Sequence, residues 1–476
     1  MRTNKILWYI GVIAIAIFYS ACTPLLVSKS VNKNIPARYS VSSDTNNTAD
    51  ENWKSFFTDS DLVSLIDTAL KNNQELNIML EEINISQNEI RAKKGEYLPF
   101  LNLGAGAGVE KVGRYTRNGA VDVSTDIEPS KRIPENLSDF ILDATLSWEV
   151  DIWKKLRNSK KAAVSKYLST VEGKNFMITN LIAEIAASYY ELIALDNQLT
   201  ILQRTIETQE NALKIVKLQK EAAKVTELAV RRFEAQVLKT KSLQYAIHQN
   251  IVETENRINF LVGRFPQPVQ RNSDRFLDYV PNTIQAGIPS QLLSNRSDIR
   301  QAELELEAAK LDVKVVRANF YPSFKINAGL GYQAFNPAFL INTPESILYN
   351  LTGDLIAPVI NRNAIKTAYL NANSRQIQAI YTYEKTVLQA YNEVVNQMSM
   401  MSNLEKSFSL RDKQVQALTE SINISTILFS SARADYMEVL LTQRDALESK
   451  MELIETKQMQ MLAMVNTYRA LGGGWK

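Results

Sequence analysis

The chain presents one pattern twice: a helical stretch, a proline, a short run of alternating apolar and polar residues, and then more helix. Pro99 leads into Leu101, Leu103 and Ala105, which alternate with Asn102, Gly104 and Gly106. Pro322 leads into Phe324, Ile326 and Ala328, which alternate with Lys325, Asn327 and Gly329. A few strands isolated between helices cannot cover their own sheet edges. The repeat therefore predicts strands that pair with strands of other chains to form a β-barrel.

Four segments carry this alternation, at 100–113, 138–150, 323–335 and 346–357. Each has one apolar face, which we assign to lipid, and one face of polar or small residues, which we assign to water. Such two-faced strands are typical of a membrane barrel with lipid outside and water inside. Four strands are too few to enclose a lumen, so the barrel requires several copies of the chain.

The remainder of the chain is predicted to be mainly α-helical, because Gly (16) and Pro (13) are scarce for 476 residues. Apolar residues recur with a seven-residue period in two helical hairpins, 155–262 and 362–471, which predicts supercoiled helix partners. The stretch 159–219 would span roughly 90 Å at 1.5 Å per residue. The hairpins turn at two similar sequences, Ala223-Lys224-Val225-Thr226 and Ala432-Arg433-Ala434-Asp435-Tyr436.

The N-terminus has the features of a lipoprotein signal peptide, predicted at 1–21. Arg2 and Lys5 precede an apolar stretch at 6–18, which is shorter than the roughly 20 residues that span a bilayer. Cys22 is the only cysteine and is predicted to be the acylated first residue of the mature protein. We expect 22–52 to be an extended tether, with order beginning at Trp53 and a single long helix running from Asp61 through Arg91.

Composition argues against several other classes of protein. The net charge of +3 leaves no basic field for nucleic acid. His248 is the only histidine, so no metal site or nucleophile dyad can be completed around it. Gly104, Gly106 and Gly108 lack the spacing of a phosphate-binding loop. We therefore expect no enzyme activity, no cofactor, and neither catalytic nor metal-binding residues.

Several motifs together resemble the TolC-like outer-membrane factors, in the lipid-anchored branch of efflux channels. They are Trp53-Lys54-Ser55-Phe56, Trp148-Glu149-Val150-Asp151, Leu261-Val262-Gly263, Ile288-Pro289-Ser290 with Arg296 and Asp298-Ile299, Tyr321-Pro322-Ser323, and Leu471-Gly472-Gly473-Gly474-Trp475. The chain departs from the family pattern at Ser297 and Lys155. Ala223 and Ala432 stand where the family usually places glycines at the hairpin tips.

The resemblance implies a homotrimer in which a 12-stranded β-barrel continues into an α-barrel tunnel across the periplasm. It implies two structural repeats, 53–280 and 281–476, each with a helix, a strand pair and a helical hairpin. The turns Ala223–Thr226 and Ala432–Tyr436 would then form the gate and dock a periplasmic adaptor, with an inner-membrane pump supplying the energy for small-molecule export. Two alternatives to this efflux duct stay open: a periplasmic lipoprotein adaptor, and a type I secretion duct for proteins.

Overall fold

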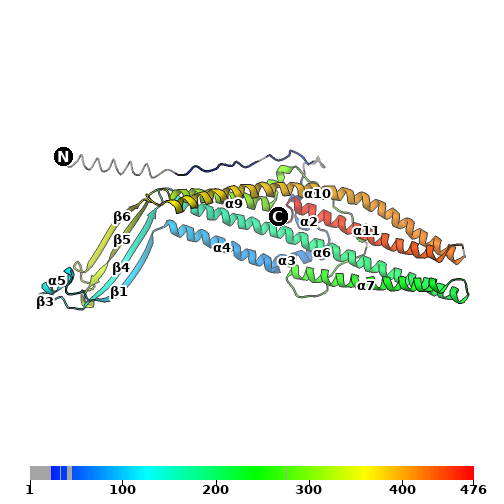
Figure 1. Cartoon of the computed structure of the whole chain (residues 1–476), viewed down its shortest axis with the longest axis horizontal. Coiled ribbons are helices and arrows are strands. Elements are labelled where there is room, and N and C mark those ends of the chain that lie inside the picture. Colours follow the sequence, from blue (N-terminus) through cyan, green and yellow to red (C-terminus); the bar gives the residue numbers. More distant parts are fainter. Residues whose placement is uncertain are drawn as a thin grey trace. The chain divides into compact units, whose positions relative to one another are not determined.

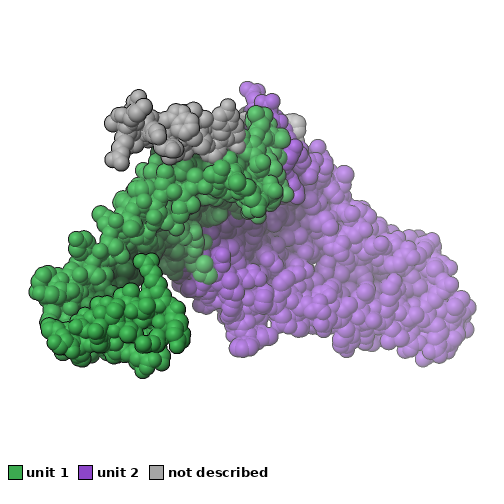
Figure 2. All heavy atoms as spheres, turned by 60° about the vertical axis from the view of Figure 1, so that its left-hand side comes forward, with its two compact units in different colours: residues 1–30, 85–167, 304–380 green, residues 31–84, 168–303, 381–476 purple. Residues whose placement is uncertain are grey.

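The computed structural model describes residues 23–32, 34–39, 46–274, 276–282, 284–431 and 433–475. Their contacts form two compact units, coloured green and purple in Figure 2. Unit 1 comprises 1–30, 85–167 and 304–380, and unit 2 comprises 31–84, 168–303 and 381–476. Each unit therefore takes segments from both sequence repeats.

The elements follow one another in this order: η1 (Thr48–Asp50), α2 (Trp53–Phe56), α3 (Ser60–Asn72), α4 (Gln74–Tyr97), β1 (Phe100–Glu110), α5 (Arg117–Ser124), β2 (Asp126–Glu128), β3 (Lys131–Arg132), β4 (Leu137–Val150), α6 (Lys155–Glu221), α7 (Glu227–Val262), η2 (Phe276–Asp278), η3 (Pro289–Gln291), α8 (Leu292–Asn295), α9 (Ser297–Ala318), β5 (Ser323–Ala334), η4 (Pro337–Phe339), β6 (Ile347–Ile356), α10 (Asn363–Ser430) and α11 (Tyr436–Ala470).

Unit 1 is built around a four-stranded antiparallel sheet in the order β1-β4-β5-β6 (Figure 1). The strand pairs of the two repeats meet at β4 and β5, where Leu146 lies opposite Ala328. Beyond β1, the polar segment 114–137 forms α5 and the small β2–β3 hairpin, which strand alternation did not predict.

Unit 2 has a hydrophobic core in which α6 and α11 carry most of the large side chains. Ile185, Tyr189 and Leu192 of α6 are fully buried together with Phe56 and Leu62 from the N-terminal helices. Phe56 stacks on Tyr468 of α11, with 4.0 Å between ring centroids. An 18-residue window of α6 is apolar enough to cross a membrane, but 72% of it is buried, as in the core helix of a folded protein.

The N-terminal segment is ordered earlier than we expected. Tyr39 is 4% exposed and stacks on Tyr391 of α10, with ring centroids 5.5 Å apart. Asn47 pairs with Ala286, and Thr48 N donates to the carbonyl of Gln285 at 2.9 Å. The expectation that order begins at Trp53 is therefore wrong, because apolar and backbone contacts tie Tyr39, Asn47 and Thr48 to other segments of unit 2.

The single helix expected from Asp61 through Arg91 is also wrong, because the chain breaks at Asn73 between α3 and α4. The Asn73 amide nitrogen donates to the carbonyl of Leu261 at 2.8 Å, and its oxygen accepts from Leu76 N. At this point Gly263 ends α7 with φ of +76°, and a Cβ there would lie 2.4 Å from the carbonyl oxygen of Asn72. The break lets two helix ends approach each other closely.

Candidate functional site

The sheet of unit 1 carries the first candidate functional surface, because its register keeps one apolar face across all four strands. Leu103 lies opposite Ala144, Ala144 opposite Leu330, and Leu330 opposite Tyr349. Side chains of this face remain accessible within the chain, with Leu103 82% and Tyr349 81% exposed. An apolar face of this extent is typical of a lipid-facing strand array.

The opposite face is polar, and its side chains bond across the strands. Ser147 of β4 donates to the amide oxygen of Asn327 on β5 at 2.9 Å, and the amide nitrogen of Asn327 donates to Asp354 of β6 at 2.9 Å. Farther along, Gln333 of β5 donates to both carboxylate oxygens of Asp139 on β4, at 2.9 and 3.0 Å. This face is suited to contact with water.

The edges of the sheet are open. Within the described residues, β1 and β6 each pair with one strand only, so the outer edge of each carries unpaired backbone groups. In hydrocarbon such groups cannot bond to water, and each unsatisfied group costs several kcal/mol. The sheet therefore requires further strands on both sides if it lies in a membrane.

The passage from β4 into α6 is fixed by Asp151, whose side chain is 2% exposed. Its carboxylate accepts from the backbone nitrogens of Leu156 and Arg157, both at 3.0 Å, and from Arg157 Nε at 3.1 Å. Next to it, Trp153 donates to the carbonyl of Pro322 at 2.7 Å and stacks on Tyr321. Amphipathic aromatic rings of this kind favour the boundary between membrane and water.

The second candidate surface consists of the two hairpin turns of unit 2, which have the same backbone geometry where both are described. Lys224 N donates to the carbonyl of Gln219 at 2.8 Å, and Arg433 N donates to the carbonyl of Leu428 at 2.8 Å. Thr226 and Asp435 are the N-cap residues of α7 and α11, both extended and neither with a side-chain cap bond. The turns are therefore structural as well as sequence repeats.

The first turn holds an alanine in a strained backbone conformation. Ala223 has φ of +56°, in the left-handed region that glycine adopts more readily. Ala432, its counterpart in the second turn, lies outside the described residues. The first turn thus keeps a glycine-like conformation with an alanine side chain.

The acid at the start of α7 pairs with cations of both helices of its hairpin. Glu227 bonds with Lys220 at 2.6 Å and with Arg231 at 2.9 Å. The hydrogen bond from Lys220 is the largest cause of a lowered pKa for this carboxyl. Neither Lys224 nor Arg433 forms an ion pair with another described residue. Lys220 escaped sequence reasoning because it belongs to the end of the preceding helix.

The tips of the two hairpins pack against each other through a small apolar cluster. Val216 of α6 and Phe233 of α7 are buried with Val439 of α11. Val225 and Tyr436, which we predicted as tip residues, lie against the same cluster. The two turns of one chain therefore form one surface.

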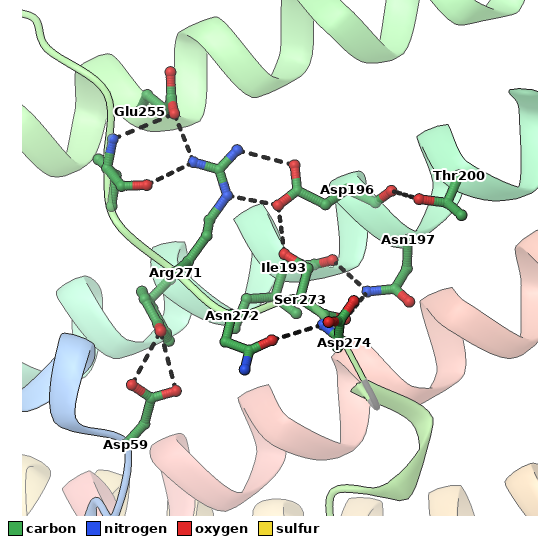
Figure 3. A network of polar contacts seen from close by, with 12 residues as sticks. Asp59, Ile193, Asp196, Asn197, Thr200, Glu255, Arg271, Asn272, Ser273 and Asp274 are labelled. Carbon is green, nitrogen blue, oxygen red and sulfur yellow. Dashed lines mark hydrogen bonds and ion pairs between the residues drawn. The ribbon is translucent and has the colours of Figure 1, made fainter.

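A polar cluster ties the linker after α7 to the first hairpin (Figure 3). Arg271 bonds to both oxygens of Asp196 on α6, at 2.6 and 2.9 Å, and to Glu255 on α7 at 2.6 Å. Burial lowers the pKa of Arg271, but the two carboxylates outweigh burial and raise it. Beside it, Asp59 accepts from Tyr189 at 3.0 Å, and burial together with Asp59 raises the pKa of that phenol. The contacts among these residues were not predicted, because single polar residues spread along a helix give no signal of a contact with a distant linker.

Comparison with known protein families shows which family the chain belongs to. The sequence profile described as outer membrane efflux protein matches residues 65–264 and 288–473. The chain belongs to the outer membrane efflux protein family. As a member of this family, it is an efflux channel of the outer membrane and extends into the periplasm.

Individual members of the family are related over most of their length. The pyoverdine export outer membrane protein OpmQ of Pseudomonas aeruginosa is 26% identical over 426 residues, which are 89% of this chain and 87% of that protein. The cation efflux system protein CusC of Escherichia coli is 24% identical over 450 residues, 93% of each chain. The open-state MtrE outer membrane channel of Neisseria gonorrhoeae has the same fold, with a TM-score of 0.82 at 22% identity over 96% of this chain and 99% of that one.

The remaining predicted site residues are placed as follows. Cys22, the predicted lipid attachment site, lies outside the described residues. Lys224, Val225, Thr226, Arg433, Ala434, Asp435 and Tyr436 lie at the two turns with Ala223. Among the residues that the structure describes, no three His, Cys, Asp or Glu side chains gather as a metal site.

Proposed function

We propose that three copies of the chain form one channel, with a 12-stranded β-barrel in the outer membrane. The observation that carries this proposal is the four-stranded sheet with an apolar face and two open edges. Pairing β1 of one copy with β6 of the next would satisfy both edges at once and close the sheet. Three copies of four strands give a barrel wide enough to keep its polar face around water.

The helical hairpins of the three chains would continue this barrel as a tunnel in the periplasm. α6 has 67 residues and α10 has 68, so each is about 100 Å long. The two turns of each chain, Ala223–Thr226 and Ala432–Tyr436, would give six similar docking points at the closed end. A periplasmic adaptor with matching tips would bind there, and an inner-membrane pump would supply the energy.

Lipid on Cys22 would anchor the mature chain in addition to the barrel. The short apolar stretch before a lone cysteine supports this proposal. One acyl chain alone gives only marginal membrane binding, whereas the three chains of a lipoprotein cysteine would add to the anchoring of a barrel that is already in the membrane. Mass spectrometry of the mature N-terminus would show acyl groups on Cys22 if the proposal is right, and an unmodified thiol would contradict it.

Small molecules are the cargo that the relatives favour. Their names refer to pyoverdine, cations, solvents and toluene. This range fits a passive duct whose selectivity resides in its pump. None of these names refers to a secreted protein or to an adaptor, so neither alternative gains support from them.

Gel migration and conductance test the proposed assembly together. Unheated protein from outer membranes should migrate as a species of three chain masses that collapses to one on heating. The same species should conduct ions across a planar lipid bilayer. A chain that migrates as a monomer at all temperatures and gives no conductance would overturn the trimeric channel.

A further inference from the structure

The charged residues of the four long strands all lie on one face of the sheet. Along β1, β4, β5 and β6 they are Glu110, Asp139, Asp143, Glu149, Lys325 and Asp354. Strand alternation and the register place each of them on the polar face, together with Ser147 and Asn327. Five carboxylates therefore stand against one lysine on this face.

Half of these charges are compensated at the end of the sheet that adjoins the helices. Lys155, which begins α6, pairs with Glu149 at 2.7 Å. Lys325 lies opposite Glu149 on one side and opposite Asp354 on the other. Two cations thus face two carboxylates at this end, and the net charge there is zero.

The acids farther along the sheet have no such compensation. Glu110 and Asp139 lie at the end remote from the helices, Asp143 lies midway along β4, and no basic residue occurs on the strands at or beyond the level of Asp143. Gly104 on β1 and Gly331 on β5 flank Asp143, so neither offers it a side chain. A Cβ at Gly104 would lie 2.3 Å from a carboxylate oxygen of Asp143, which therefore extends over that glycine.

The surroundings of these acids leave their charge in place. Asp139 accepts from the Gln333 amide, a neutral donor that holds the carboxylate without cancelling its charge. The two segments that connect the strands at this end, 111–136 and 335–346, together carry five basic and five acidic residues. The net charge of these segments is therefore zero, and each chain contributes three uncompensated negative charges to the polar face.

The width of the proposed barrel decides whether this charge reaches the pore axis. Twelve strands spaced by about 4.8 Å and tilted by about 40° give a backbone radius of about 12 Å. The carboxylates extend inward from that radius, so they lie within roughly one Debye length of the axis at about 0.1 M salt, where that length is about 10 Å. The fields of three copies therefore overlap in the pore, which concentrates cations and depletes anions there.

We propose that the channel passes cations in preference to anions, and that Glu110, Asp139 and Asp143 set this preference. The inference rests on the proposed trimer, since only a closed barrel turns the polar face into a pore wall. The preference arises from the field of the whole face rather than from a binding site, so it extends from small ions to larger cationic cargo. The duct would then add a charge preference to the selectivity of its pump.

Reversal potentials of the purified trimer in planar bilayers, measured under a KCl gradient, test the proposal. Around 0.1 M KCl, potassium should be at least about tenfold more permeant than chloride. Near 1 M KCl the Debye length is only about 3 Å, and the preference should largely disappear. Equal permeability at the lower salt, or a preference for chloride, in a channel that conducts would overturn this inference alone. Absence of any conductance would overturn the proposed trimeric channel and this inference with it.

Variants assign the preference to the three acids. Glu110→Gln, Asp139→Asn and Asp143→Asn together remove the charge but keep an acceptor oxygen at each position, so Gln333 retains a partner. This triple variant should lower the preference for potassium at least about threefold. Asp143→Asn alone breaks no hydrogen bond among the described residues and should give part of that loss, even if the triple variant fails to assemble.

Lys325→Gln is the control of opposite sign. It removes the one basic residue of the strands and should raise the preference for potassium. Heat-modifiable migration checks that each variant assembles as the wild type does. Acid variants that assemble normally and keep the full preference for potassium would show that other residues set it, and would refute the assignment.

Discussion

Substitution of arginine on the two faces of β1 tests the sheet assignment most directly. Leu103 belongs to the apolar row with Ala144, Leu330 and Tyr349, and is 82% exposed within the chain. Its neighbour Asn102 points to the opposite face, because successive side chains of a strand alternate. Leu103→Arg and Asn102→Arg therefore form a matched pair that differs by one residue in position.

The expected difference in stability between the two variants follows from the depth of Leu103 in the bilayer. Arginine on the lipid face costs about 2–4 kcal/mol at the bilayer midplane and less toward the interfaces. Leu103 is the fourth of the 11 residues of β1 and lies somewhat off centre, so about 2 kcal/mol per chain is expected. That corresponds to a loss of about 30-fold in the folding equilibrium of each chain. Asn102→Arg keeps its charge in water and should fold normally.

Heat-modifiable migration after folding into lipid vesicles, followed over a urea series, measures this difference. The midpoint for Leu103→Arg should fall well below wild type, whereas Asn102→Arg should keep its midpoint and change the single-channel conductance. Equal losses in the two variants, or a loss confined to Asn102→Arg, would show that the inside and outside faces are assigned wrongly.

Three further predictions concern unit 2. Arg271→Met should lower the free energy of unfolding by about 2 kcal/mol, because Asp196 loses its partner in a half-buried site, and a second change, Asp196→Asn, should restore part of the thermal midpoint. Ala223→Gly should raise local stability at the first turn by about 0.5–1 kcal/mol, since it relieves a left-handed alanine; slower amide exchange at the turn would show this, and faster exchange would contradict it. The Glu227 carboxyl has a lowered pKa in the folded chain, so its contribution is present above the ordinary glutamate pKa of about 4.3 and is lost as pH falls through the folded value. After correction for the intrinsic exchange rate at each pH, the protection of amides at this turn should fall in acid, and Lys220→Gln should remove that dependence on pH.

Strand faces could be predicted from the sequence because period-two alternation is a local signal that survives without knowledge of partners. The apolar run beginning at Leu101 has the same face in the sheet that alternation assigns to it. The helical hairpins could also be predicted, since α6 and α7 are joined by the repeated turn sequence near Ala223. Both signals depend on neighbours within one element.

Features that depend on distant contacts were not predictable. The break at Asn73 follows from a bond to Leu261, and the order at Tyr39 follows from its stacking on Tyr391. The linker cluster around Arg271 likewise joins residues far apart in the sequence. The helical pattern around Asn73 is continuous, so only the tertiary bond could reveal that two helices meet there.

The open edges of the sheet have a genetic consequence. In the proposed trimer, β1 and β6 of each copy would pair with edge strands of the two neighbouring copies. No copy could therefore fold its membrane part alone. A damaged β1 or β6 in one copy would leave a gap in the whole ring. With equal expression of normal and damaged chains, random assembly leaves only about one ring in eight without a damaged copy. Edge-strand mutations should therefore be dominant, whereas mutations that unfold the chain before assembly should be recessive.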